Sequence, residues 1–489
     1  MKAPTSLTYD RYALVVFALL VFVYGYFLRS DLSDNETAHL GLAFAIVQEG
    51  RLTIDSFHDA PLTRTIDKSF YDGHYYSTKA PGTGLVSALV YGTIARPVDF
   101  LSRGFGWDAT ERFHLLKYLI TMGAVGLPSA FSASTLYLLG ALIVGDRWKA
   151  YVATMAIACG TMLWPFSTLL FAHALAAALL FVSFYLIVRV KLTPQSDHTW
   201  TAAGAAFLLG LAIQVEYTSA ILVAGIALYA LSLCVTGDIQ ISSLKQGIVA
   251  SIGFLLPTAM SFAYNAACFG SPFSNAYSYV VATEFQDFAR QGFFGIAWPD
   301  CRNIYYLTIH PYRGIFAQSP ILIAAVIGFP AMIRTPRWRL EAALGLFAVA
   351  GYLFMNAGYA CWWGGWTFGP RFLIPMLPFL ALPLVLTLNR KPSFVMGLGL
   401  WSIAQMSIPT AGSPLTSDRL ARTMAHGAGL PFFGTSPIFG EALQRLESGR
   451  YARNLGMLAG LHGWTSLLPL VVVVLGVSAY FFHKRSIQV

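Results

Sequence analysis

The chain has 489 residues, of which 56% are hydrophobic and 11% are charged. A soluble protein carries about 25% charged residues, so charge this sparse excludes a soluble globular domain. The formal net charge is +9, but the basic residues lie in short clusters between apolar stretches. This distribution follows the positive-inside rule of membrane proteins and argues against nucleic acid as a partner.

Apolar stretches of about 17–25 residues recur along the chain, which is the length that a helix needs to cross the hydrocarbon core. Backbone groups must satisfy one another in lipid, so these stretches predict helices rather than strands. The sequence therefore predicts an all-α polytopic membrane protein with about 12–13 transmembrane helices. The apolar stretches lie near 12–28, 82–98, 113–143, 150–166, 170–190, 200–217, 219–235, 247–266, 319–333, 342–358, 371–388, 393–409 and 464–482.

The first stretch, Tyr12 to Leu28, follows Lys2 and Arg11 and has no small-residue cleavage site after it. These features predict a retained first span with a cytoplasmic N-terminus. Near the other end of the chain, basic clusters alternate with long polar segments; the clusters are Arg334/Arg337/Arg339, Arg390/Lys391 and Lys484/Arg485. If the clusters are cytoplasmic, the long segments all lie on the outer face.

Thirteen crossings would leave the two termini on opposite sides of the membrane. Two solutions remain open: one stretch between 113 and 236 does not cross, or the 113–143 stretch crosses twice. Gly123, Gly126 and Pro128 lie within that stretch and could break its helix.

We expect residues 1–410 to form one transmembrane module that includes the outer loops 31–80 and 268–318. Residues 411–463 form a further outer loop, and 464–489 form the last transmembrane helix and a cytoplasmic tail. The five cysteines show no metal-like spacing. Cys268 and Cys301 flank one outer loop, where a disulfide is one option.

The first outer segment opens with Ser33-Asp34-Asn35-Glu36, and apolar residues then recur at helical spacing from Ala38 to Ile46. This pattern predicts an amphipathic helix on the outer membrane surface. Two interpretations of its start remain open. Ser33 and Glu36 fit a capping box, with Asp34 favourable near the positive helix end. Alternatively, a carboxylate acts at the membrane boundary as a general base.

The same segment ends in a run from Asp67 to Gly82 that contains Asp72-Gly73, which predicts a tight turn between aromatic flanks. Lys79 shortly precedes Pro81, which suits the first turn of the next span. A lysine beside a helix N-terminus can hold a phosphate. The alternative is an interfacial lysine that snorkels toward lipid head groups.

Two further ionisable residues stand out. His173 lies near a span end, as either a substrate ligand or a satisfied interfacial histidine. Glu216 lies inside an apolar stretch, where a charge is costly and a functional role is the default expectation. A structural ion pair is the alternative for Glu216.

The run from Cys361 to Arg371 contains three tryptophans around the paired glycines Gly364 and Gly365. Such a run suits a sugar-stacking platform beside an anion clamp formed by the arginine. An aromatic belt with a snorkelling arginine is the alternative.

At these residues the sequence resembles the GT-C superfamily of polytopic glycosyltransferases. Within it, the likeness is to the branch of protein mannosyltransferases and the aminoarabinose transferases that modify lipid A. The likeness rests on four stretches in order: Asp34-Asn35-Glu36 with a surface helix through Gly50, Tyr75 to Gly82, Tyr264-Asn265 with Phe269 to Pro272, and Trp362 to Arg371 with Pro375 and Pro378.

The resemblance implies a membrane glycosyltransferase that moves a sugar from a polyprenyl-phosphate donor to an acceptor hydroxyl of a glycan, lipid or protein. It implies a multi-pass protein of the plasma (inner) membrane with its active site on the outer face. It places the catalytic carboxylate at the start of the first outer helix, at Asp34 or Glu36. Asn35 interrupts the family's usual Asp-Glu pair, so the choice between the two carboxylates stays open.

The resemblance also assigns a phosphate contact to Lys79, and we add Arg371 as a second one. No metal-ligand cluster is evident, so we expect no essential metal or other cofactor, although some relatives use a divalent ion. Partners other than the donor and acceptor are membrane lipids. The remaining candidates are Tyr75 and Tyr76 for the donor, and His39, His173, Asn265, Trp363 and Trp366 for the substrate.

A transporter or lipid flippase is the alternative from another class. Such proteins place ionisable groups near the bilayer midplane, on broken helices within repeated halves. This sequence shows no internal repeat, and most of its charges lie at span ends or in loops, with Glu216 as the chief exception. A non-catalytic lipid-binding scaffold on the same fold is a third option.

Overall fold

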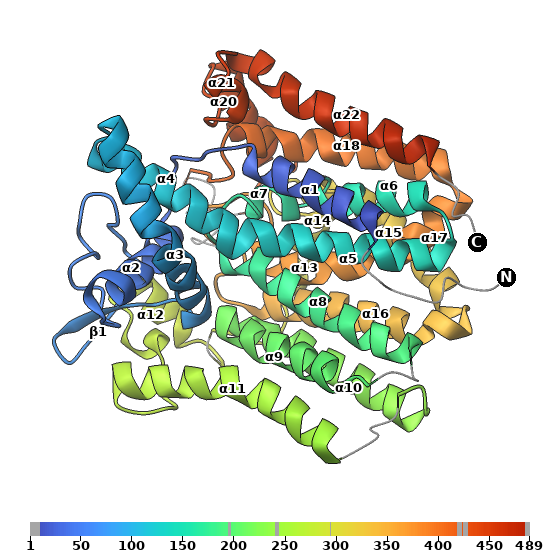
Figure 1. The fold of residues 1–489 in the computed structure, drawn as a ribbon, viewed down its shortest axis with the longest axis horizontal. Coiled ribbons are helices and arrows are strands. Elements are labelled where there is room, and N and C mark those ends of the chain that lie inside the picture. Colours follow the sequence, from blue (N-terminus) through green and yellow to red (C-terminus); the bar gives the residue numbers. More distant parts are fainter. Residues whose placement is uncertain are drawn as a thin grey trace.

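The computed structural model describes residues 10–193, 197–239, 244–293, 295–417, 423 and 429–484. Within these ranges, nine helices are long and apolar enough to cross a membrane. Three shorter apolar helices accompany them, namely Arg11–Gly25, Thr199–Val215 and Ile321–Ile333. The chain is therefore a multi-pass helical membrane protein, as predicted (Figure 1).

The helices of the bundle are α1 (Arg11–Gly25), α3 (Pro81–Phe105), α4 (Ala109–Thr121), α5 (Leu127–Val144), α6 (Arg147–Ala158), α7 (Leu163–Phe166), α8 (Ala172–Leu192), α9 (Thr199–Val215), α10 (Ala220–Val235), α11 (Leu244–Phe269), α15 (Ile321–Ile333), α16 (Arg339–Gly358), α17 (Ala381–Arg390), α18 (Pro392–Ala411) and α22 (Leu468–His483). A 3-10 helix, Arg371–Leu380, leads directly into α17.

The segments between the helices contain α2 (Asp34–Phe44), a π-helical turn (Ala45–Glu49), β1 (Lys68–Tyr71), β2 (His74–Ser77), a 3-10 turn (Ala276–Tyr279), α12 (Thr283–Ala289), α13 (Cys301–Thr308), α14 (Ile315–Gln318), α20 (Leu443–Glu447) and α21 (Leu455–Leu458). The two strands form one antiparallel hairpin.

Burial separates the centre of the bundle from its periphery. In the candidate span Arg371–Arg390, 83% of the most apolar stretch is buried inside the protein. The corresponding share is 11% in α11 and 17% in the last span, Gly463–His483. Apolar side chains on these two outer helices therefore face the surroundings of the protein, which is the environment that lipid provides.

The 113–143 stretch does not cross twice. Residues 109–144 form one continuous helical segment, with a π-helical turn at Met122–Gly126 between α4 and α5. Gly123, Gly126 and Pro128 thus distort the helix without ending it, because the backbone ladder reforms beyond the bulge. The 150–166 stretch behaves differently, since it divides into α6 and the single turn α7.

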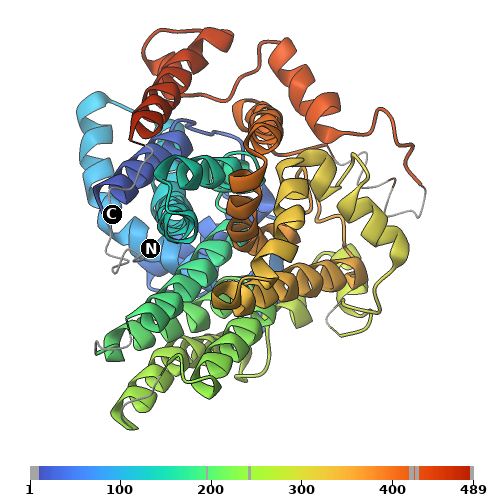
Figure 2. The same ribbon diagram turned by 90° about the vertical axis from the view of Figure 1, so that its right-hand side faces the viewer.

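The first and last helices meet at their terminal ends. The ring of Tyr12 lies 6.0 Å from the rings of both Tyr480 and Phe481. Helices α1 and α22 therefore run antiparallel, with the start of α1 and the end of α22 at the end of the bundle that faces the viewer in Figure 2. A first helix that begins and a last helix that ends at the same end of the bundle agree with the even number of crossings that the sequence predicts.

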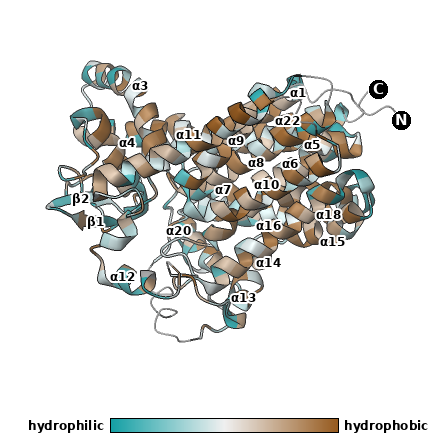
Figure 3. Cartoon of the chain, turned by 90° about the horizontal axis from the view of Figure 1, so that it is seen from below, coloured by the Kyte–Doolittle hydropathy of each residue, from teal (hydrophilic) through white to brown (hydrophobic). Residues whose placement is uncertain are grey.

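The long polar segments gather at the opposite end, where Figure 3 shows hydrophilic residues around β1, β2 and α12. Isolated β-bridges tie these segments together in pairs: Phe27 with Asn454, Ser69 with Val280, Ile296 with Tyr359 and Thr367 with Leu415. The prediction that the large loops share one face is confirmed in this sense, because all of them meet at one end of the bundle.

Helix α2 forms where the sequence predicts a helix, but the protein surrounds it. Every residue from Glu36 to Phe44 is buried. Helix α3 packs closely on it, since a Cβ added at Gly84 would lie 2.7 Å from Leu42 Cδ2. The helix is therefore enclosed by neighbouring elements and does not lie with one face on a membrane surface.

The disulfide considered between Cys268 and Cys301 is absent. Both thiols are free; Cys268 is buried at the end of α11, and Cys301 is exposed at the start of α13. Cys268 packs in a small cluster with Tyr76 and Phe269, so its thiol serves as an apolar group there.

Candidate active site

The β1–β2 hairpin places a lysine beside a carboxylate. Asp72, with a φ of 49°, and Gly73, with a φ of 83°, make the tight turn that the sequence predicts. The register that follows pairs Lys68 with Ser77, so Asp67 and Lys79 come together beyond the two strands. Lys79 Nζ lies 2.7 Å from Asp67 Oδ2, and both side chains are largely buried.

Asp34 lies next to this ion pair. Its Oδ1 accepts a hydrogen bond of 2.8 Å from the backbone N–H of Ile66, the residue before Asp67. Burial raises the pKa of Asp34, and the charge of Asp67 adds to the rise, while the Ile66 N–H and Lys79 oppose it. A half-buried carboxylate with a raised pKa is a stronger base than a solvated one, which suits proton abstraction.

Glu36 has a different environment from Asp34. Its side chain is fully buried and closes the capping box with Ser33, as one interpretation of the sequence proposed. Oε1 accepts from the backbone N–H of Leu170 at 3.2 Å and lies 3.4 Å from Lys117 Nζ. Because Glu36 links the start of α2 to α4 and to the α7–α8 connection, its contacts are those of a structural carboxylate.

Two buried histidines, His39 and His173, lie next to the Lys79 site. His39 is buried in α2, and its Nε2 has no hydrogen-bond partner among the described residues. Burial lowers the pKa of His39 to about 3, and Lys79 contributes to the shift, so this imidazole is neutral. His173 Nδ1 lies 3.3 Å from Glu216 Oε2.

Glu216 occupies the junction between α9 and the 3-10 turn that precedes α10. Burial raises the pKa of Glu216, and the charges of Arg371 and Lys79 oppose the rise, so these side chains are close enough to interact. The close approach of α3 to α9 explains this placement, since a Cβ at Gly82 would lie 2.6 Å from Gln214 C. Glu216, the residue that most favours a transporter, therefore lies at a helix end beside Lys79.

Arg371 lies at the start of the 3-10 helix that leads into α17. Its guanidinium contacts the faces of Phe171 and Phe372, at 5.4 and 5.2 Å from the ring centroids. Gly364 and Gly365 have φ angles of 75° and 73°, and a Cβ at Gly364 would lie 3.3 Å from Arg371 Cγ. The paired glycines thus let the backbone wrap around the arginine.

Arg313, between α13 and α14, is a site residue that the sequence analysis did not identify. It is 1% exposed, and its Nη2 donates to the carbonyl of Gly365 at 2.9 Å. Its Nε and Nη1 have no partner among the described residues. Burial lowers the pKa of Arg313, which Tyr312 opposes and the charge of Arg371 reinforces.

Arg313 and Arg371 therefore bring two positive charges to Gly365. Arg371 Nη2 lies 3.8 Å from the position that a Cβ on Gly365 would occupy. Within the described part of the chain, neither guanidinium forms an ion pair with a carboxylate. Buried charges are normally paired, so this arrangement calls for an anion.

Three further predicted residues contact other parts of the outer loops. Tyr75 stacks on His58 at 3.9 Å, whereas Tyr76 is buried against Phe269 at 5.1 Å. Asn265, near the end of α11, donates to the carbonyl of Pro272 at 3.3 Å. These contacts give the three side chains packing and capping roles in the outer loops.

The three tryptophans of the Cys361–Arg371 run differ in burial. Trp362 and Trp363 are both 7% exposed and pack with Tyr306 and Tyr312 in a cluster of their own. Trp366 is 41% exposed and keeps a free face. Of the predicted stacking platform, only Trp366 therefore offers a surface to a ligand in this state.

Two residues of the site, Asp67 and Arg313, are not among the residues predicted from the sequence, and they differ in whether the sequence contains a sign of their role. Asp67 could have been found, because a two-residue turn at Asp72-Gly73 fixes which residues face each other across the hairpin. Arg313 had no such signal, since its role depends on a contact with Gly365 across 52 positions.

Within the described ranges, no group of three or more His, Cys, Asp or Glu residues could hold a metal ion.

No known protein-family model matches the sequence, and no curated protein matches it. Among solved structures, the chain is similar to the crystal structure of ArnT from Cupriavidus metallidurans bound to undecaprenyl phosphate. The TM-score is 0.52, with 13% sequence identity over 96% of this chain and 75% of that chain. An archaeal oligosaccharyltransferase, AglB from Archaeoglobus fulgidus, in complex with an inhibitory peptide and a dolichol-phosphate, gives a TM-score of 0.42 at 12% identity, over 92% of this chain and 57% of that one.

The similarity to ArnT extends over nearly the whole chain, so it concerns the architecture and not a shared motif alone. It agrees with the resemblance that the outer-loop motifs predict. This chain therefore shares the overall fold of ArnT, a fold of membrane-spanning helices.

Proposed function

We propose that this protein is a membrane glycosyltransferase that moves a sugar from a polyprenyl-phosphate donor to an acceptor hydroxyl. The observation that carries the proposal is the meeting of Asp34 with the Asp67–Lys79 ion pair at one end of the bundle. The fold supports it, because ArnT, which has this architecture, was crystallised with undecaprenyl phosphate.

In the proposed reaction, Asp34 takes the proton of the acceptor hydroxyl, and the acceptor oxygen attacks the anomeric carbon of the donor sugar. The bond between that carbon and the phosphate oxygen breaks, and polyprenyl phosphate leaves with both bonding electrons. Attack opposite the leaving group inverts the anomeric centre. Asp34 is the better base of the two candidates, since Glu36 is held by Ser33, Leu170 and Lys117.

The leaving phosphate gains one negative charge during this step, because a phosphodiester monoanion becomes a monoester. Lys79 is already partly neutralised by Asp67, whereas Arg313 and Arg371 lack a carboxylate partner among the described residues. We propose that Lys79 orients the phosphate and that the two arginines stabilise the charge that develops. Fixed cations that act most strongly on the transition state lower the barrier to reaction.

We place this site on the outer face of the plasma membrane, where the donor's lipid stays in the bilayer while its sugar meets the acceptor. An epitope inserted at the exposed Asp72–Gly73 turn should be accessible to an antibody on intact spheroplasts. Accessibility only after permeabilisation would contradict this orientation.

The test of function is mass spectrometry of surface glycans and lipids from cells that lack the protein. We expect a sugar substitution to disappear and to return with the wild-type chain but not with Asp34→Asn. Asp72→Asn is the matched control, because it removes an exposed carboxylate from the same loop at a left-handed position that asparagine tolerates. Unchanged glycans in the deletion strain, or full restoration by Asp34→Asn, would contradict the proposal.

A further inference from the structure

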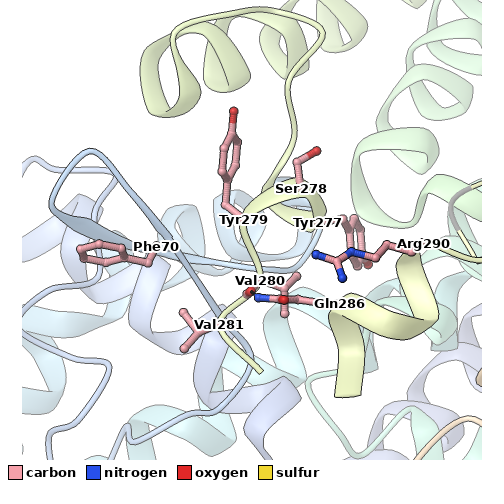
Figure 4. A pocket seen from close by; sticks show the side chains of 8 residues that line it. All are labelled: Phe70, Tyr277, Ser278, Tyr279, Val280, Val281, Gln286 and Arg290. Atoms are coloured by element: carbon pink, nitrogen blue, oxygen red, sulfur yellow. Dashed lines mark hydrogen bonds between the residues drawn. The ribbon is translucent and has the colours of Figure 1, made fainter. Parts of the chain in front are cut away.

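A cavity of about 570 Å³ lies between the first and second outer loops, apart from the cluster around Lys79. Its volume lies within the roughly 300–1,000 Å³ that small-ligand sites usually have. Phe70 contributes from β1, Tyr277 and Tyr279 from the 3-10 turn, Gln286 from α12, and Arg290 from the position directly after α12 (Figure 4).

Contacts between the two loops preform this cavity. Ser69 of β1 forms a β-bridge with Val280, and its Oγ donates to the carbonyl of Ala276 at 2.6 Å. The backbone N–H of Val281 donates to the carbonyl of Lys68 at 3.1 Å. These contacts also occupy the edge of β1, so an extended peptide could not add there as a further strand.

Tyr277 connects the cavity to the candidate active site. It lines the cavity, and its ring centroid lies 6.2 Å from that of Tyr217, the residue after Glu216. Burial raises the pKa of Tyr277, and the charges of Glu216 and Asp67 add to the rise. Tyr277 therefore lines the cavity and also packs against the residue that follows Glu216.

The lining chemistry points to a particular class of ligand. Phe70 is 48% exposed, and aromatic faces of this kind stack on sugar rings. Gln286 is held in place by its Nε2, which donates to the carbonyl of Val280 at 2.6 Å. Arg290 is 76% exposed, and its contact with Asp287 is long at 3.9 Å, so its guanidinium can bind a second anion.

We propose that this cavity is the acceptor site and that the acceptor is a carbohydrate with an anionic group. This inference rests on the proposed glycosyl transfer. The aromatic rings bind the sugar, Gln286 contacts its hydroxyls, and Arg290 binds a carboxylate or phosphate on it. None of the described lining residues is an aspartate or glutamate, and the carboxylate of Asp287 lies 3.9 Å from Arg290 Nη1 outside the lining.

The experiment measures acceptor binding without donor, using the full chain in lipid nanodiscs and isothermal titration calorimetry. The probes are a disaccharide that ends in glucuronate, the neutral disaccharide of the same linkage, and a serine-rich peptide. We expect the glucuronate probe to bind most tightly. Arg290→Gln should weaken it about tenfold and leave the neutral disaccharide unchanged, because a charge-assisted contact of about 1.4 kcal/mol is lost.

Two further variants complete the test. Phe70→Ala should weaken both disaccharides, and its exposed position makes misfolding a small concern. Arg51→Gln removes an exposed arginine from the first outer loop outside the cavity and should change neither affinity. The proposal is overturned if the wild-type chain binds neither sugar, if the peptide binds more tightly than both, or if Arg290→Gln behaves like Arg51→Gln. Since no donor is present, such a failure would leave sugar transfer itself untouched.

Discussion

Two carboxylates two positions apart, Asp34 and Glu36, have different surroundings, and we propose separate roles for them. Asp34 keeps one hydrogen-bond donor on Oδ1 and lies beside the Asp67–Lys79 pair. Glu36 is fully buried and contacts two other parts of the chain, α4 and the α7–α8 connection. The sequence places both at a helix start, but only tertiary packing shows which one is available to a substrate.

Asp34 as the base predicts a pH dependence. The carboxylate must be ionised to accept a proton, and its pKa is raised above 3.8. We therefore expect kcat/KM for sugar transfer to rise with pH through an apparent pKa above 3.8 and then to level off. Initial rates across a buffer series measure this profile. A profile that is flat down to pH 4, with the wild-type fold intact, would exclude Asp34 as the base.

Glu36→Gln should act on stability. It removes one partner of the buried pair with Lys117, which costs roughly 3–5 kcal/mol when the other charge stays buried. Thermal unfolding of the purified protein in detergent should show a clearly lower Tm, while correctly folded protein retains transfer activity. Normal stability together with lost activity would instead make Glu36 the catalytic residue.

Arg313→Gln should weaken binding of the leaving group. The second pKa of a phosphate monoester is about 6, so polyprenyl phosphate carries nearly two negative charges at pH 8. We expect the wild-type chain to bind it more tightly at pH 8 than at pH 5, and the variant to lose about tenfold at pH 8. Microscale thermophoresis measures both, with the exposed Arg64→Gln as control. Equal affinities for the Arg313 and Arg64 variants would remove Arg313 from the site.

At the scale of elements, two contacts bring the site together: the β1–β2 hairpin and the packing of α3 on α9. The hairpin was predictable, because Asp72-Gly73 specifies its turn and the turn specifies its register. The approach of α3 to α9 was not, since Gly82 alone does not indicate which helix it faces. Its partner, the backbone at Gln214, is 132 positions away in the sequence.

Gly82→Ala should therefore disturb the site from a distance. The added Cβ would meet the Gln214 backbone at 2.6 Å, so α3 must shift away from α9 and move Lys79 relative to Glu216. We expect lower kcat and weaker donor binding in steady-state assays of the variant. Gly104→Ala in the same helix meets nothing within 4 Å and should keep full activity. Equal activity of the two variants would contradict this account of the packing.

For the whole molecule, hydropathy predicted the fold class and the gathering of the outer loops. It could not decide how 113–143 behaves, because glycine and proline in a helix permit either a break or a bulge. The sequence also predicts more exposed tryptophans than the structure has. Trp363 is expected to be exposed in a polar loop, but it packs in a buried cluster with Tyr306 and Tyr312. Composition identifies candidates for a site, whereas burial decides which of them can meet a ligand.

We propose that a carrier phosphate binds at this end of the bundle between Lys79 and the two arginines, with Asp34 facing the sugar. A cryo-EM structure of the full chain in nanodiscs with a polyprenyl-phosphate sugar tests it most directly. We predict phosphate density within hydrogen-bond distance of Lys79 and Arg371, with the anomeric carbon toward Asp34. Phosphate bound elsewhere, or a sugar directed away from Asp34, would contradict the account.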